Sequence, residues 1–156
     1  NKGTCFTILI PTFHEKAEIS LDQQPSIATE GGNEGVLLVD NEPEQVEIGK
    51  QILESLGYKV TTSSDSSKAL ELFQDSPQSF DILITDMMMP KMMGTTLAKE
   101  LVKIRPNIAI LICSGLDQEL MVDMLEETKR IEFLPKPISY KKLATSIRNL
   151  LDNEVH

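Results

Sequence analysis

The segment Ile82-Leu83-Ile84-Thr85-Asp86 decides how this sequence folds. It begins with apolar and β-branched residues, which favour a strand, and such continuous apolar character is typical of a strand covered on both faces. The run ends in Asp86, so a carboxylate stands where the strand would leave its sheet. Ile108 to Cys113 is equally apolar, and we expect these two segments to be central strands of one parallel sheet.

Shorter apolar runs flank these two segments and alternate with stretches of helical period. Strands are predicted at Val36 to Val39, Tyr58 to Thr61, Ile82 to Thr85, Ile108 to Cys113 and Ile131 to Leu134. Helices are predicted from apolar residues that recur on one face, namely Val46, Ile52, Leu53 and Leu56, then Ala69, Leu70 and Phe73, then Leu97, Leu101 and Ile104, then Leu120, Met121, Met124 and Leu125, and last Leu143, Ile147, Leu150 and Leu151. Five strand and helix pairs predict a complete doubly wound α/β domain.

The chain before this domain has a different character. Residues 12–35 are rich in Gln, Glu, Ser, Gly and Pro, which is typical of a flexible linker. Ahead of the linker, Thr4 to Ile10 has the alternation of a lone strand. Since a lone strand cannot bury itself, we expect it to pair with another sheet or to be a fragment of a divided domain.

Composition narrows the class of partner. The formal net charge is −9, which argues against binding to nucleic acid or to an anionic membrane and favours a protein partner. Cys5 and Cys113 are too few for a disulfide framework, and no apolar stretch is long enough to cross a bilayer. We therefore expect a cytoplasmic protein.

Two acidic residues stand at predicted strand ends. Asp40 closes the first strand and Asp86 closes the third. The carboxyl ends of adjacent parallel strands share one crevice, so these carboxylates should converge. Two like charges in one crevice raise a carboxyl pKa or recruit a cation, and oxygen ligands suit Mg²⁺, which takes few carboxylates and keeps several waters. Either residue taken alone is also an ordinary turn residue.

A hydroxyl and an amine are expected at the same edge. Ser114 follows the fourth strand, and Lys136 follows the fifth, just before Pro137. The bond between Lys136 and Pro137 is one that can be cis. A carboxylate, a cation, a hydroxyl and a lysine around one crevice are suited to neutralising a phosphoryl group during transfer, with Asp86 as the only well-placed nucleophile.

These motifs resemble the receiver domains of bacterial response regulators and hybrid kinases over nearly all of Val36 to Leu151. The resemblance rests on an acidic start after the first strand, an aspartate followed by Met-Pro and a glycine, a hydroxyl residue after the fourth strand, and Lys-Pro after the fifth. Those features are matched here by Asp40 with Asn41, Asp86 with Met89-Pro90 and Gly94, Ser114, and Lys136-Pro137. The resemblance implies a flavodoxin-like sheet of strand order 2-1-3-4-5 with helices on both faces.

The resemblance also implies a role for each matched residue. Asp86 would accept a phosphoryl group from phosphohistidine in a Mg²⁺-dependent, self-catalysed reaction, with Lys136 as the phosphoryl contact. Asp40, Asp86, Asn41 and the backbone carbonyl of Met88 would form the metal site. Ser114 and Phe133 would form a switch, in which Phe133 swings inward when Ser114 moves toward the phosphoryl oxygen; a plain core aromatic is the alternative for Phe133.

One departure from the family pattern concerns the metal. Asn41 stands where the family usually has a second acidic residue. An amide oxygen brings no charge, so we expect weaker metal binding and slower phosphorylation, unless Glu42 compensates. The alternative is a pseudo-receiver, a protein-binding module that takes no phosphoryl group. An aspartyl hydrolase would need a second aspartate at Met88, and a flavin site would need a phosphate loop after the first strand, so neither is favoured.

The N-terminal segment has a resemblance of its own. Lys2 to Pro11 is similar to the closing strand of histidine-kinase ATP-binding domains. It implies a remnant strand at 1–11, a linker at 12–35 and a receiver at 36–153, all from the C-terminal part of a hybrid sensor kinase without a DNA-binding output domain. The expected partner is a histidine kinase core or a histidine phosphotransfer protein, and homodimer formation stays open.

Overall fold

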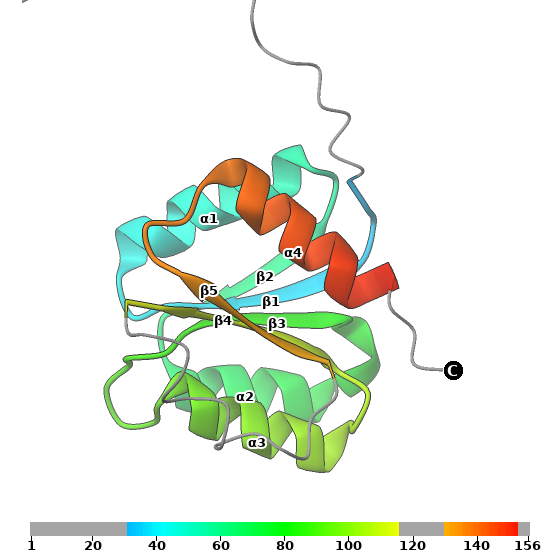
Figure 1. The fold of residues 1–156 in the computed structure, drawn as a ribbon. Coiled ribbons are helices and arrows are strands. Elements are labelled where there is room, and N and C mark those ends of the chain that lie inside the picture. The colour runs from blue at the N-terminus through cyan, green and yellow to red at the C-terminus, as the bar shows by residue number, and fades with distance from the viewer. Residues whose placement is uncertain (1–30, 116–129, 153–156) are drawn as a thin grey trace, which may run out of the picture.

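A five-stranded parallel sheet forms the centre of the structure (Figure 1). The computed structural model describes residues 31–115 and 130–152. The strands are β1 Gly35–Val39, β2 Lys59–Ser63, β3 Ile82–Asp86, β4 Ala109–Ser114 and β5 Ile131–Pro135. Their order is β2-β1-β3-β4-β5 and every pairing is parallel, so the predicted order is confirmed. The two most apolar strands, β3 and β4, are interior strands, as their composition predicts.

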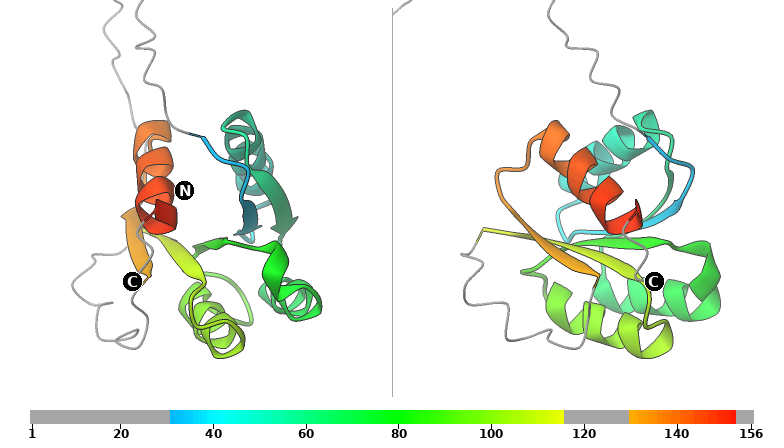
Figure 2. Two further views of the ribbon diagram at one scale, coloured as in Figure 1. Left: turned by 90° about the vertical axis from the view of Figure 1, so that its right-hand side faces the viewer. Right: turned by 45° about the vertical axis from the view of Figure 1, so that its right-hand side comes forward.

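Helices cover both faces of this sheet. Their bounds are α1 Pro43–Ser55, α2 Ser66–Asp75, α3 Gly94–Ile104 and α4 Tyr140–Asp152, with a short 3₁₀ turn η1 at Pro77–Ser79. Figure 1 shows α1 and α4 on one face and α2 and α3 on the other, and the turned views of Figure 2 agree. This arrangement confirms the predicted doubly wound class.

Each face has its own hydrophobic core, because side chains alternate along every strand. On β1, Leu37 and Val39 pack toward α2 and α3, whereas Val36 and Leu38 pack toward α1 and α4. The buried helical residues Phe73, Leu97 and Leu101 complete the first core, and Leu53, Leu143 and Ile147 complete the second. Among the described residues, those predicted for the helix faces lie there, although Val46, Ile52, Leu70 and Leu151 are only partly buried and Ile104, the last residue of α3, is partly exposed.

The helix ends follow from local chemistry. Pro43 occupies the first turn of α1, where its missing N–H is not needed. Gly57 follows the end of α1 with a φ of +94°, a conformation that favours glycine. Asp65 caps α2 by accepting hydrogen bonds from the backbone N–H of Ser67 and Lys68. Ser139, just before α4, accepts a hydrogen bond on its side chain from Lys142 N–H.

Some predicted segments lie outside the described residues. They are the lone strand at Thr4 to Ile10, most of the linker, and the helix expected around Leu120 to Leu125. The last residues of the expected linker are described, and they contact the domain. Gly32 N–H donates to the Leu56 carbonyl at 3.1 Å, and Glu34 forms an ion pair with Arg148 of α4 at 2.8 Å.

Candidate functional site

Strand register brings the two predicted carboxylates together. Val39 of β1 pairs with Thr85 of β3, so the residues that follow them, Asp40 and Asp86, leave the sheet side by side. Asp86 in turn pairs with Cys113 of β4. Because all the strands are parallel, the acidic ends of β1 and β3 lie at the carboxyl edge of the sheet, as the sequence predicts.

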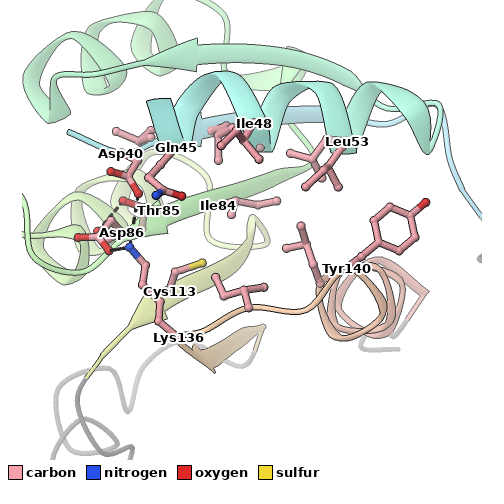
Figure 3. A pocket seen from close by; sticks show the side chains of 16 residues that line it. Asp40, Gln45, Ile48, Leu53, Ile84, Thr85, Asp86, Cys113, Lys136 and Tyr140 are labelled. Carbon is pink, nitrogen blue, oxygen red and sulfur yellow. Dashed lines mark hydrogen bonds and ion pairs between the residues drawn. The ribbon is translucent and has the colours of Figure 1, made fainter. Parts of the chain in front are cut away.

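Lys136 joins these two carboxylates. Its Nζ lies 2.5 Å from Asp86 Oδ1 and 3.5 Å from Asp40 Oδ2 (Figure 3). Burial lowers the pKa of Lys136, but the hydrogen bond and charge of Asp86, together with the charge of Asp40, outweigh burial, so the pKa lies above its ordinary value. Lys136 is therefore charged at neutral pH. The Lys136-Pro137 peptide bond is cis.

Backbone groups hold the other oxygen of each carboxylate. Glu42 N–H donates to Asp40 Oδ1 at 2.9 Å, and Met88 N–H donates to Asp86 Oδ2 at 2.8 Å. The remaining oxygens, Asp40 Oδ2 and Asp86 Oδ1, both face the Lys136 ammonium. Two nearly buried carboxylates thus present one oxygen each to a common position that suits a cation.

Glycine allows the next helix to start against Asp86. A Cβ on Gly94 would lie 2.2 Å from the Asp86 carbonyl oxygen, so α3 can begin this close only with glycine there. Gly94 N–H donates to the Met87 carbonyl at 3.0 Å, and Met87 N–H donates to the Cys113 carbonyl at 2.9 Å. These contacts fix the chain on the C-terminal side of Asp86.

The donor set fits Mg²⁺ better than a softer metal. Within residues 31–115 and 130–152, no three or more His, Cys, Asp or Glu side chains gather as a metal cluster. Two carboxylate oxygens are present, and the Met88 carbonyl accepts no hydrogen bond from another described residue. Few carboxylates with a carbonyl and room for water are the oxygen ligands that Mg²⁺ uses. Burial raises the pKa of the nearby Cys113 thiol to about 12, so it offers no thiolate.

Asn41 and Glu42 are less closely associated with this cluster. Asn41 is partly exposed and Glu42 is exposed, and neither side chain lines the cavity that Asp40, Asp86 and Lys136 share. Met88 is 61% exposed, and its backbone N–H, which donates to Asp86, is its contact with the cluster. Of the four predicted metal residues, the structure brings the side chains of Asp40 and Asp86 together.

Ser114 and Phe133 lie on neighbouring strands. Ser114 ends β4, is buried, and accepts a hydrogen bond on its carbonyl from Lys136 N–H at 2.8 Å. Phe133 of β5 pairs with Ile112 of β4. It is partly buried and packs against the core on the α2 and α3 side. Ser114 is thus linked by the backbone to the lysine of the site, and Phe133 stands three residues before that lysine.

The site opens into a cavity of about 150 Å³. The sequence predicted a crevice at the strand ends but not the extension of this cavity along α1. The cavity runs from Asp40, Asp86 and Lys136 along α1 toward the start of α4 (Figure 3). Its wall is mostly apolar and includes Ile48 and Tyr140, whose exposed fractions are 54% and 45%. Gln45 adds an amide at the polar end. Residues this far from Asp86 in the chain come together only through the packing of α1 and α4 on the sheet.

None of the helices in the described part of the chain has both the length and the apolar character to cross a membrane.

The family model for the response regulator receiver domain matches residues 36–148. Among curated proteins, the sensor kinase CckA of Brucella abortus (strain 2308) is 34% identical over 162 residues, which cover 98% of this chain and 17% of that protein. Other relatives match over about half of their length, so the chain spans only a part of the curated proteins that it resembles.

Two solved structures have closely similar folds. A response regulator receiver domain protein from Clostridium thermocellum has a TM-score of 0.71 at 31% identity, covering 76% of this chain and 94% of that chain. A complex of CheX and CheY with BeF3 and Mg²⁺ from Borrelia burgdorferi has a TM-score of 0.68 at 27% identity, covering 75% and 88%. Both support the sheet order and the helix arrangement described above.

Proposed function

Because the chain belongs to the response regulator receiver domain family, we propose that it accepts a phosphoryl group on Asp86 and relays the signal to a protein partner. One observation carries this proposal. Register places Asp40 beside Asp86, and Lys136 Nζ contacts both carboxylates, so an acid pair and a cation meet at one point. This is the charge arrangement that phosphoryl transfer needs.

The chemistry of the transfer follows from these groups. A carboxylate oxygen of Asp86 attacks phosphorus, the bond from phosphorus to the imidazole nitrogen of phosphohistidine breaks, and that nitrogen keeps the electron pair. Lys136 neutralises charge on the phosphoryl oxygens, and its raised pKa keeps it protonated at neutral pH. The Met88 N–H bond to Asp86 Oδ2 leaves the Oδ1 side of the carboxylate as the attacking side.

Mg²⁺ is the proposed metal. Asp40, Asp86 and the Met88 carbonyl would hold it, and Asn41 would add at most a neutral oxygen. When bound, Mg²⁺ would offset the negative charge of the carboxylates and of the entering phosphoryl group. The Mg²⁺ complex of a similar CheY supports this proposal.

Ser114 and Phe133 are the proposed switch. Ser114 is buried at the carboxyl edge of the sheet, and its carbonyl accepts a hydrogen bond from Lys136 N–H. A move of its hydroxyl toward a phosphoryl oxygen on Asp86 would change the packing next to β5, where Phe133 is partly buried. The face around β5 would then report phosphorylation to the partner.

The proposed partner is a protein that carries phosphohistidine, either a histidine kinase core or a histidine phosphotransfer protein. Two exposed apolar side chains, Ile48 and Tyr140, line the cavity that extends from Asp86 along α1, and a protein surface would cover them. The match to CckA extends over 98% of this chain, well beyond the receiver. That extent supports a hybrid sensor kinase as the parent protein, with a remnant strand at 1–11, a linker at 12–35 and a receiver at 36–153.

Intact-mass measurement tests the proposal. The full chain is incubated with Mg²⁺ and phosphoramidate, a small donor whose phosphorus is bonded to nitrogen as in phosphohistidine. We expect one added phosphoryl group on the unchanged chain and none on Asp86→Asn, because the amide cannot act as the nucleophile. A chain that stays unmodified, or a variant that is modified equally, contradicts the proposal.

A phosphorylation-independent receiver is the second candidate, and Asn41 favours it. The residue brings no charge to the metal site and does not line the cavity of Asp86. In this case, incubation with Mg²⁺ and any phosphodonor would leave the mass of the chain unchanged. Asn41→Asp distinguishes a weakened acceptor from an inactive module, since it would accelerate phosphorylation of the former.

A further inference from the structure

Two polar side chains that line the cavity beside the acid pair, Thr85 and Lys136, make contacts with Asp86. Thr85 Oγ1 donates to the Asp86 carbonyl at 3.0 Å, and Lys136 contacts both carboxylates. Gln45 also lines this end of the cavity, yet its amide makes no hydrogen bond with any residue of 31–115 or 130–152. Figure 3 shows the Gln45 side chain extending toward Asp40 and Asp86. An exposed amide that bonds to no described residue thus extends toward the carboxylates.

The position of Gln45 is set by the start of α1. The helix begins at Pro43, so Gln45 belongs to its first turn. Glu42 N–H, just before the helix, donates to Asp40 Oδ1 at 2.9 Å and ties the entry of α1 to the carboxylate. Pro43 restricts the backbone between them. The backbone of Gln45 is therefore held close to the acid pair.

Gln45 lines the cavity beside the acid pair, and Asn41 does not. Asn41 occupies the position of the missing family acid but does not line the cavity, whereas Gln45 does. Mg²⁺ keeps several bound waters, and each of them needs hydrogen-bond acceptors around the site. An amide oxygen is such an acceptor. Gln45 therefore offers the site an oxygen from the cavity wall that Asn41 does not provide.

We propose that the side-chain oxygen of Gln45 accepts a hydrogen bond from a water molecule bound to Mg²⁺, which makes Gln45 a positioning residue for the metal. This inference rests on the proposed function, since it concerns the metal of the same site. The contact strengthens Mg²⁺ binding at a site in which only two carboxylates take part. It acts through water and so leaves the phosphoryl transfer step itself unchanged.

Mg²⁺ titration by calorimetry on the full chain tests this proposal. Gln45→Met keeps the length and helix preference of the side chain but removes the oxygen. We expect its dissociation constant for Mg²⁺ to rise about three- to tenfold, the range of one hydrogen bond. The matched control is Gln51→Met on the same helix, because Gln51 is exposed and bonds to Glu47 instead of lining the cavity. The control should bind Mg²⁺ with unchanged affinity.

A kinetic readout separates positioning from other roles. With phosphoramidate as donor, Gln45→Met should need correspondingly more Mg²⁺ for half-maximal rate and reach the same rate at saturation. Equal Mg²⁺ affinity in Gln45→Met and the unchanged chain overturns the inference. So does a lower rate at saturating Mg²⁺ with unchanged affinity, which would indicate a direct phosphoryl contact. If the unchanged chain binds no Mg²⁺, the proposed function loses its metal and this inference falls with it; if the chain binds Mg²⁺ and is phosphorylated, only the role of Gln45 is in question.

Discussion

The two ends of the sheet each hold one basic side chain between two carboxylates, but they differ in how firmly it is held. At the carboxyl edge, Lys136 bridges Asp40 and Asp86. At the opposite edge, Arg148 of α4 lies 2.8 Å from Glu34 Oε1 and 2.5 Å from Asp152 Oδ1. The side chain of Lys136 is 38% exposed and that of Arg148 is 17% exposed.

The difference indicates different tasks. Arg148 also donates to the Tyr58 hydroxyl at 3.4 Å, so its planar guanidinium joins the segment before β1, the start of β2 and the end of α4. Burial raises the pKa of Tyr58, although Arg148 opposes this, so the hydroxyl stays neutral. Lys136 is a compact charge on a mobile stem that can follow a phosphoryl group. We infer an anchor at one end and a reaction site at the other.

The largest expected effect is at Lys136. Lys136→Met should slow phosphorylation by about 100-fold or more, since a group that stabilises developing charge is lost. The free energy of unfolding with Mg²⁺ present should change by less than about 1 kcal/mol, because water screens the partly exposed ammonium. Intact-mass time courses and urea unfolding measure the two quantities. A variant that is phosphorylated at the normal rate would refute the role of Lys136.

The opposite pattern is expected at Arg148. Arg148→Met should lower the free energy of unfolding by about 2 kcal/mol, because Glu34 and Tyr58 lose a charged hydrogen-bond donor in a partly buried place. The rate of phosphorylation in the folded protein should not change. Urea unfolding at neutral pH measures the loss.

Arg148→Lys is the matched control for this variant. It keeps the charge but not the planar donors, so its stability should lie between those of the other two proteins. If Arg148→Met slows phosphorylation as strongly as Lys136→Met does, the division between anchor and reaction site is wrong.

The smallest effect is expected at a third, exposed ion pair. Lys91 Nζ lies 2.6 Å from Asp65 Oδ2 and, with the N–H groups of Lys68 and Ser67, lowers the pKa of Asp65 to about 2. A lowered carboxyl pKa stabilises the fold above the ordinary value and loses this contribution as pH falls toward the folded value. The stability of the unchanged chain should thus decrease between about pH 4 and about pH 2 partly through Asp65.

Asp65→Asn tests this dependence, because its amide oxygen can still cap α2 while its charge is gone. Urea unfolding at about pH 5 and about pH 2.5 should show a smaller loss of stability on acidification for the variant than for the unchanged chain. An equal loss in both proteins would assign the acid sensitivity to other carboxylates.

Strand positions were predictable because each strand leaves a local pattern. All five predicted strands start and end within two residues of the observed ones, and Asp86 was identified as the end of β3. Asp40, Ser114 and Lys136 were predicted at one edge because parallel strands share a carboxyl end. Nothing local marks the contacts between Arg148 and Glu34, which are 114 positions apart, or between Lys91 and Asp65, which are 26 apart.

The sequence by itself determined the class of fold and the set of reactive groups, since apolar periodicity and the residue at each strand end are properties of short segments. Only the tertiary structure decided which atoms meet. Lys136 reaches both carboxylates, Asn41 stays off the cavity wall, and Gln45 lines it, because these relations depend on how α1 and α4 pack against the sheet. Packing brings together residues that are far apart in the chain, so local sequence patterns do not predict these contacts.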